Sequence, residues 1–157
     1  MVLLICLICA LVVLAIACMK AASDADDAAE VMAQEYSDEY LLAKLMQMRS
    51  GDGWADWAVM LVGEVVMNRV ESWRFPDTIE AVIYADNPVQ FEEIYSREWD
   101  ELVPGAEFLD LAQRLINGER ALGDKTMLFT GSKPEGIGTL VTYYDRTSNK
   151  ITYFCRG

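Results

Sequence analysis

The sequence predicts an α+β domain in which the helices come first and a small antiparallel sheet comes near the C-terminus. Two observations indicate this class. Apolar residues recur at helical spacing between residues 37 and 117, and three short runs rich in Thr, Tyr, Val and Ile follow Gly123. Helices followed by a group of strands are typical of α+β domains, since α/β domains alternate the two.

The first helix is expected to start at the N-cap Ser37 and to end near Arg49, because glycines at positions 51 and 53 interrupt the pattern. Residues 54–70 are apolar on nearly every face, which predicts a central helix packed on several sides. The other expected elements are a short helix capped by Asp77 and running to 84, an irregular segment at 89–93, a helix from Pro104 to 116, and strands at 126–130, 139–144 and 151–155.

Residues 1–19 form an uninterrupted apolar run close to the length of a bilayer-spanning helix. They are expected to be either a membrane anchor or a cleaved signal peptide with its cleavage site before Cys18. Residues 20–36 are small and acidic, which suits a solvated spacer. Residues 37–157 are then the folded domain. We expect this domain to lie outside the cytoplasm, membrane-anchored or secreted.

The charge and the missing residue types exclude several functions. The net charge of -12 argues against nucleic acid as a partner, because phosphate contacts need clustered Lys and Arg. The absence of His removes Ser-His-Asp and Cys-His catalysis and the commonest zinc ligand. Cys155 is the only cysteine after residue 19, so no disulfide is expected within the folded part. No metal site and no cofactor are predicted.

Three motifs in order carry a resemblance to a known family. They are "VVMNRV" at residues 65–70, "FPDTI" at 75–79 and "QF" at 90–91, placed after a helix that ends in a glycine turn. Over roughly residues 37–155 the chain resembles the cell wall hydrolase family typified by the spore cortex-lytic enzyme (SleB type).

The resemblance implies a lysozyme-like domain whose partner is peptidoglycan. It implies cleavage of the glycan strand between N-acetylmuramic acid and N-acetylglucosamine, as a lytic transglycosylase or a muramidase. A single carboxylic acid can serve there as proton donor and then as base. The family places its glutamate where this chain has Arg49. Arginine is a poor proton donor because its side chain stays protonated.

Two other acids are candidates for the catalytic role, Glu64 first and Asp52 second. Glu64 interrupts the most apolar part of the central helix, so it must face a cleft or a partner such as Arg49 or Arg69. Asp52 lies between two glycines, where it is also typical of an ordinary turn.

Five residues are predicted to contact substrate, and most have a structural alternative. Amides and aromatic faces suit pyranose rings. Phe91 is otherwise a core residue, Gln90 a turn cap and Arg49 a helix-end cation that complements the dipole. Asn68 together with Arg69 can instead organise the fold by satisfying buried backbone groups. The predicted substrate-binding residues are Arg49, Asn68, Gln90, Phe91 and Glu92, and Glu93 follows them.

Two functional hypotheses follow from these residues. In the first, the chain is a peptidoglycan hydrolase with a relocated acid. In the second, it is a catalytically inactive relative that binds peptidoglycan or a cell-wall partner, because Arg49 occupies the position of the catalytic glutamate.

Overall fold

The computed structural model describes residues 19–20, 37–50, 53–86 and 89–157, and the chain divides into two compact units, Met1–Ser37 and Asp38–Gly157. The predicted anchor or signal at 1–19 and the spacer at 20–36 lie outside the described residues, apart from Met19 and Lys20. Within the described ranges, no helix combines the length and the apolarity that a membrane span requires.

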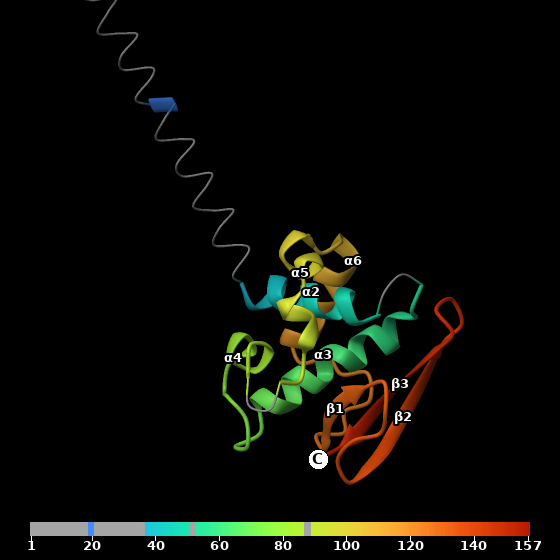
Figure 1. Ribbon diagram of the computed structural model, residues 1–157. Coiled ribbons are helices and arrows are strands. Elements are labelled where there is room, and N and C mark those ends of the chain that lie inside the picture. Colours follow the sequence, from blue (N-terminus) through green and yellow to red (C-terminus); the bar gives the residue numbers. More distant parts are fainter. Residues whose placement is uncertain (1–18, 21–36, 51–52, 87–88) are drawn as a thin grey trace, which may run out of the picture. The chain divides into compact units, whose positions relative to one another are not determined.

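The second unit contains the predicted order of helices followed by strands (Figure 1). This arrangement confirms the α+β class. The elements are α2 (Asp38–Ser50), α3 (Asp56–Val70), α4 (Ile79–Ile83), the 3₁₀ helix η1 (Glu92–Tyr95), α5 (Arg97–Glu101), α6 (Ala106–Ile116), β1 (Met127–Gly131), β2 (Gly138–Asp145) and β3 (Lys150–Arg156).

Helix α3 is the centre of the unit, as its apolar sequence predicts. Every residue from 58 to 66 is buried, and the helix contacts α2, α4, α6 and β1. In Figure 1 it runs between the other helices and the sheet. A helix that is covered on all sides needs apolar residues on all sides, which is why its sequence has no polar face.

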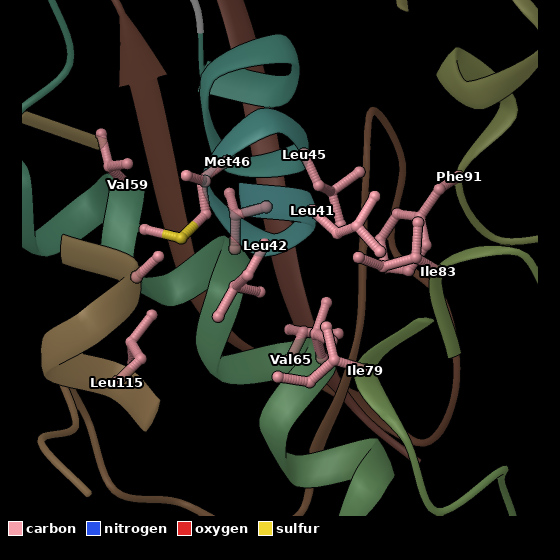
Figure 2. Close-up of a cluster of buried hydrophobic side chains, with 14 of the residues drawn as sticks. Leu41, Leu42, Leu45, Met46, Val59, Val65, Ile79, Ile83, Phe91 and Leu115 are labelled. Carbon is pink, nitrogen blue, oxygen red and sulfur yellow. The ribbon is translucent and has the colours of Figure 1, made fainter. Parts of the chain in front are cut away.

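Gly63 allows three helices to meet closely. A Cβ atom at this position would lie 2.4 Å from Leu115 Cδ1 of α6 and 2.8 Å from Met46 Sδ of α2. Both neighbours belong to the buried core, and Figure 2 shows Leu115 and Met46 on the same side of the cluster. The glycine is therefore required by packing, which outweighs the lower helix propensity of glycine.

The three strands form one antiparallel sheet in the order β1-β3-β2. The last two strands make the hairpin that the turn-like residues 145–150 predict, and the loop is shorter than expected because Asp145 pairs with Lys150. Phe154 and Cys155 in the central strand are buried, whereas β2 is largely exposed. The sheet thus adds one face to the core and leaves an outer strand in solvent.

Several element boundaries differ from the expectation for local reasons. The cap of α4 is Thr78, whose Oγ1 accepts a hydrogen bond from the Ala81 amide at 3.2 Å, and not Asp77. Helix α3 begins at Asp56, and α6 begins after Gly105. The short helices η1 and α5 were not predicted, since each spans about one turn and leaves little periodicity to detect.

Candidate functional site

Two adjoining cavities lie where α2, η1 and β1 meet, and together we call them the groove. The larger has a volume of about 590 Å³ and the smaller a volume of about 350 Å³. Both are lined by Arg49, Glu93, Thr130, Gly131 and Ser132. The larger cavity extends along the start of β3 to Tyr153, and the smaller extends over Gln90, Glu92 and Glu135.

Arg49 lies at the junction of the two cavities and is more than a helix-end cation. Its Nη1 donates to Glu93 Oε1 at 2.7 Å, and its Nη2 donates to the carbonyl oxygens of Gln90 at 3.1 Å and Thr130 at 3.0 Å. The guanidinium also lies 5.5 Å from the centre of the Phe91 ring. These contacts tie the end of α2 to the segment before η1 and to β1, so the cation is held in one place.

Glu93 is the carboxyl group that lies beside Arg49. Its side chain is 25% exposed, and its Oε2 atom is buried without a hydrogen-bond partner among the described residues. It was not one of the predicted site residues, although it lies two positions after the "QF" motif and next to the predicted Glu92. In a 3₁₀ helix consecutive residues point in different directions, so the sequence did not indicate which of Glu92 and Glu93 faces inward.

Gln90 and Glu92, both predicted to contact substrate, line the smaller cavity. The Gln90 amide nitrogen donates to the Thr130 carbonyl at 3.3 Å, and its oxygen accepts a hydrogen bond from Arg69. Glu92 is exposed. Gln90 is therefore held between α3 and β1, while Glu92 faces solvent at the rim.

Phe91 lies in the core and not in the groove. Its side chain is 1% exposed and lines neither cavity. Figure 2 shows it close to Ile83 and Leu41. The predicted contact between Phe91 and substrate is therefore wrong. The Phe91 ring instead packs in the core next to the Arg49 guanidinium.

Asn68 and Arg69 dock the first strand onto α3. The Asn68 amide donates to the carbonyl oxygens of Asp124 and Met127, each at 3.0 Å, and Arg69 Nε donates to that of Leu128 at 2.7 Å. Asn68 is 3% exposed and lines neither cavity, so the structure gives it the fold-organising role and not the predicted substrate contact. Unpaired carbonyl groups at a buried strand end are costly, and these two side chains satisfy them.

Arg69 remains a cation despite its burial. Desolvation lowers its pKa to about 10, and the nearby charge of Glu135 partly opposes that shift. The guanidinium lies 4.6 Å from the ring centre of Phe75 and 5.3 Å from that of Phe129. At neutral pH the group is still protonated, and the aromatic faces stabilise its charge.

Glu64, the first predicted acid, lies away from the groove. It is fully buried, its Oε2 accepts hydrogen bonds from the amides of Ala121 at 2.8 Å and Leu122 at 2.9 Å, and its Oε1 accepts one from Gly123 at 2.6 Å. Its partners are therefore backbone amides and not Arg49 or Arg69. This geometry corrects the predicted catalytic role, because the carboxylate holds the segment before β1 and cannot reach a ligand in the groove. Asp52, the second predicted acid, lies outside the described residues.

Aromatic side chains form one wall of the larger cavity. Trp54 and Tyr153 line it, and the Trp54 ring lies 4.3 Å from that of Tyr143, centre to centre. On the polar side, Thr130 Oγ1 and Arg49 Nε are buried without hydrogen-bond partners among the described residues, as Glu93 Oε2 is. Buried polar atoms are nearly always paired in a finished structure. With Trp54 Nε1, four such atoms belong to residues that line this cavity, which indicates a place where a polar ligand supplies missing partners.

Two solved structures with a similar fold are catalytic domains of SleB proteins. The catalytic domain of the germination-specific lytic transglycosylase SleB from Bacillus anthracis matches with a TM-score of 0.55 at 20% identity, covering 77% of this chain and 97% of that chain. The catalytic domain of the Bacillus cereus SleB protein matches with a TM-score of 0.54 at 21% identity, covering 76% of this chain and 89% of that chain. At these identities the likeness shows the fold alone, which is helices followed by a small antiparallel sheet.

A search of the curated proteins gives no match. The sequence itself matches the family described as Cell Wall Hydrolase over residues 56–154. The matched region begins with α3 and ends in β3, so it contains both the docking residues of α3 and the sheet. Because the match spans more than half of the chain, this protein belongs to the cell wall hydrolase family.

Proposed function

We propose that the domain cleaves the glycan strand of peptidoglycan in the groove between α2, η1 and β1. The observation that carries this proposal is that Arg49 Nε, Glu93 Oε2 and Thr130 Oγ1, all of residues that line one cavity, are buried without hydrogen-bond partners in the described part of the chain. A polysaccharide has hydroxyl and acetamido groups that both donate and accept hydrogen bonds, so it can satisfy all three atoms. Membership of the cell wall hydrolase family supports the same substrate.

The shape of the groove suits a chain-like ligand. Its two cavities adjoin, and the lining of the larger includes the aromatic side chains of Trp54 and Tyr153 as well as polar residues. Aromatic faces pack against the apolar faces of sugar rings, while polar groups at the edge fix their orientation. Two adjoining sites allow neighbouring sugars to bind on either side of the bond that breaks.

The proposal extends to how the domain reaches its substrate. The apolar residues 1–19 either anchor the protein in the membrane or direct its secretion, and the acidic residues 20–36 separate that segment from the domain. Peptidoglycan lies outside the cytoplasmic membrane, so either route brings the groove to it.

The test is digestion of purified peptidoglycan sacculi with the full-length protein in mild detergent, followed by mass spectrometry of the soluble products. We expect muropeptides to be released. A 1,6-anhydromuramyl end identifies a lytic transglycosylase, because the C6 hydroxyl has attacked the anomeric carbon, and a reducing end identifies a muramidase. Absence of any soluble muropeptide would contradict the proposed cleavage.

A second function is binding without cleavage, and one observation favours it. Arg49 occupies the position where the family resemblance expects glutamate, and it contacts Glu93, which is the carboxyl group that both cavities share among the described residues. In this case the protein sediments with sacculi and releases nothing, and Arg49→Glu produces cleavage where there was none. The family match favours cleavage over this alternative.

A further inference from the structure

Carboxyl groups line the groove at three of the described residues, and their positions differ. Glu93 lines both cavities, whereas Glu92 and Glu135 line only the smaller one. Glu92 is exposed at the rim, and the charge of Glu135 acts on Arg69. Glu93 is thus the described carboxyl group at the junction, where a glycan chain running through both cavities would pass.

The two oxygens of Glu93 have different surroundings. Oε1 accepts the hydrogen bond from Arg49 at 2.7 Å, whereas Oε2 is buried and has no donor among the described residues. An unpaired carboxylate oxygen in a buried position is unfavourable. The Glu93 side chain as a whole is 25% exposed and lines both cavities, so a ligand in the groove lies against a carboxyl group that lacks one partner.

Arg49 fixes the orientation of this carboxyl group. Its Nη2 atom is held by the backbone carbonyls of Gln90 and Thr130, on two different segments, while Nη1 holds Glu93. A guanidinium with three acceptors in its plane has little freedom to rotate. Arg49 thus orients the Glu93 carboxyl group and does not itself donate the proton.

From these contacts we infer that Glu93 is the catalytic carboxyl group of the groove and that Arg49 is the residue that positions it. The inference rests on the proposed cleavage of glycan. The family resemblance expects the catalytic acid at the end of α2. Here the acid is instead in η1, on the residue that pairs with Arg49.

The chemistry balances with one carboxyl group. In its protonated form Glu93 gives its proton to the bridging oxygen, and the bond from that oxygen to the anomeric carbon breaks with its electron pair going to the oxygen. A hydroxyl oxygen, from water or from the same sugar, forms the new bond to the anomeric carbon and gives its proton to the Glu93 carboxylate. The acid is regenerated, and no other reactant is required.

Arg49 contributes to the middle of this cycle. After the first proton transfer Glu93 is negatively charged, and the guanidinium at 2.7 Å stabilises that charge until the second transfer. Its positive charge is already in place, so little reorganisation is needed when the carboxylate forms.

The test compares the full-length protein with Glu93→Gln, and with Glu98→Gln as a matched control on the exposed surface of α5. Turnover is measured as muropeptide release and binding as sedimentation with sacculi. We expect Glu93→Gln to lower kcat by about 100-fold or more, because it removes acid catalysis, and to bind sacculi as the unmodified protein does. Glu98→Gln should change neither quantity.

The positioning role of Arg49 is tested with Arg49→Lys and Arg49→Met. Lysine retains the positive charge beside Glu93 and methionine removes it, so Arg49→Lys should keep a larger share of kcat, with KM changed little in both. Equal kcat in all three proteins, or an equal loss in the two variants, would overturn the positioning role.

The outcomes separate the inference from the function on which it rests. If the unmodified protein cleaves and Glu93→Gln cleaves equally well, Glu93 is not the acid, although the proposed function stands. If the unmodified protein releases no muropeptide, the proposed cleavage fails and the catalytic role of Glu93 fails with it. Cooperative thermal unfolding of each variant confirms that a loss of turnover is not a loss of fold.

Discussion

At the scale of single residues, the neighbourhood of a carboxylate decides what it can do. Glu64 and Glu93 are both largely removed from solvent, but three backbone amides bind Glu64, whereas one Arg49 nitrogen binds Glu93 and leaves an oxygen unpaired. A fully satisfied buried carboxylate stabilises the fold. A partly satisfied one that lines a cavity is available for chemistry.

Glu64→Gln is expected to lower stability and to leave catalysis unchanged. The Gln side chain replaces one acceptor oxygen with an NH₂ group that faces backbone N–H donors, so at least one buried amide loses its partner. We expect the free energy of unfolding to fall by about 2–3 kcal/mol in urea denaturation. Muropeptide release per folded molecule should equal that of the unmodified protein. Loss of turnover with unchanged stability would return Glu64 to the list of candidate acids.

At the scale of the elements, α3 organises both the core and the groove. Its apolar residues pack against α2, α4, α6 and β1. In its last turn, Asn68 binds both β1 and the segment before it, and Arg69 binds β1. Thr130 and Gly131 of that strand form a wall of the groove. The position of the groove wall therefore depends on how closely α3 packs.

Gly63→Ala tests this packing. Alanine improves helix propensity by about 1 kcal/mol. However, its methyl group would clash with Leu115 and Met46, because both lie closer than a normal van der Waals contact. Overpacking a close-packed core costs about 1–3 kcal/mol, so we expect a net loss of about 1 kcal/mol in the free energy of unfolding, measured by urea denaturation. A more stable variant would show that the neighbouring side chains repack without strain.

At the scale of the whole molecule, residues 38–157 are a compact unit that is distinct from the N-terminal segment. Residues 38–157 form one compact unit with a continuous hydrophobic core that draws on the helices and on β1 and β3. A unit with its own core contains the interactions needed for its stability. The interactions that build this unit are thus contained within residues 38–157.

Residues 38–157 produced alone should fold as the full-length protein does. We expect cooperative thermal unfolding with the same midpoint in both proteins, because the core lies entirely within this unit. Circular dichroism melts of the two proteins in the same mild detergent provide the comparison. A non-cooperative transition in the shorter protein would show that the residues before 38 contribute to folding.

The sequence by itself determined the order of elements, the hairpin and the family, because these depend on local periodicity and on motifs that are contiguous in the chain. The order and spacing of "VVMNRV", "FPDTI" and "QF" indicated the family that the sequence match shows and a fold similar to that of the SleB catalytic domains. The fold-organising alternative for Asn68 and the core alternative for Phe91 were also visible from residue type alone.

Only the tertiary structure decided which carboxyl group lies in the groove. Arg49 and Glu93 are 44 residues apart, and Arg49 also contacts Thr130, 81 residues away. No local pattern encodes such contacts, because they arise when α2, η1 and β1 pack around α3. For the same reason the backbone partners of Glu64, more than 50 residues later in the chain, became known only from the fold.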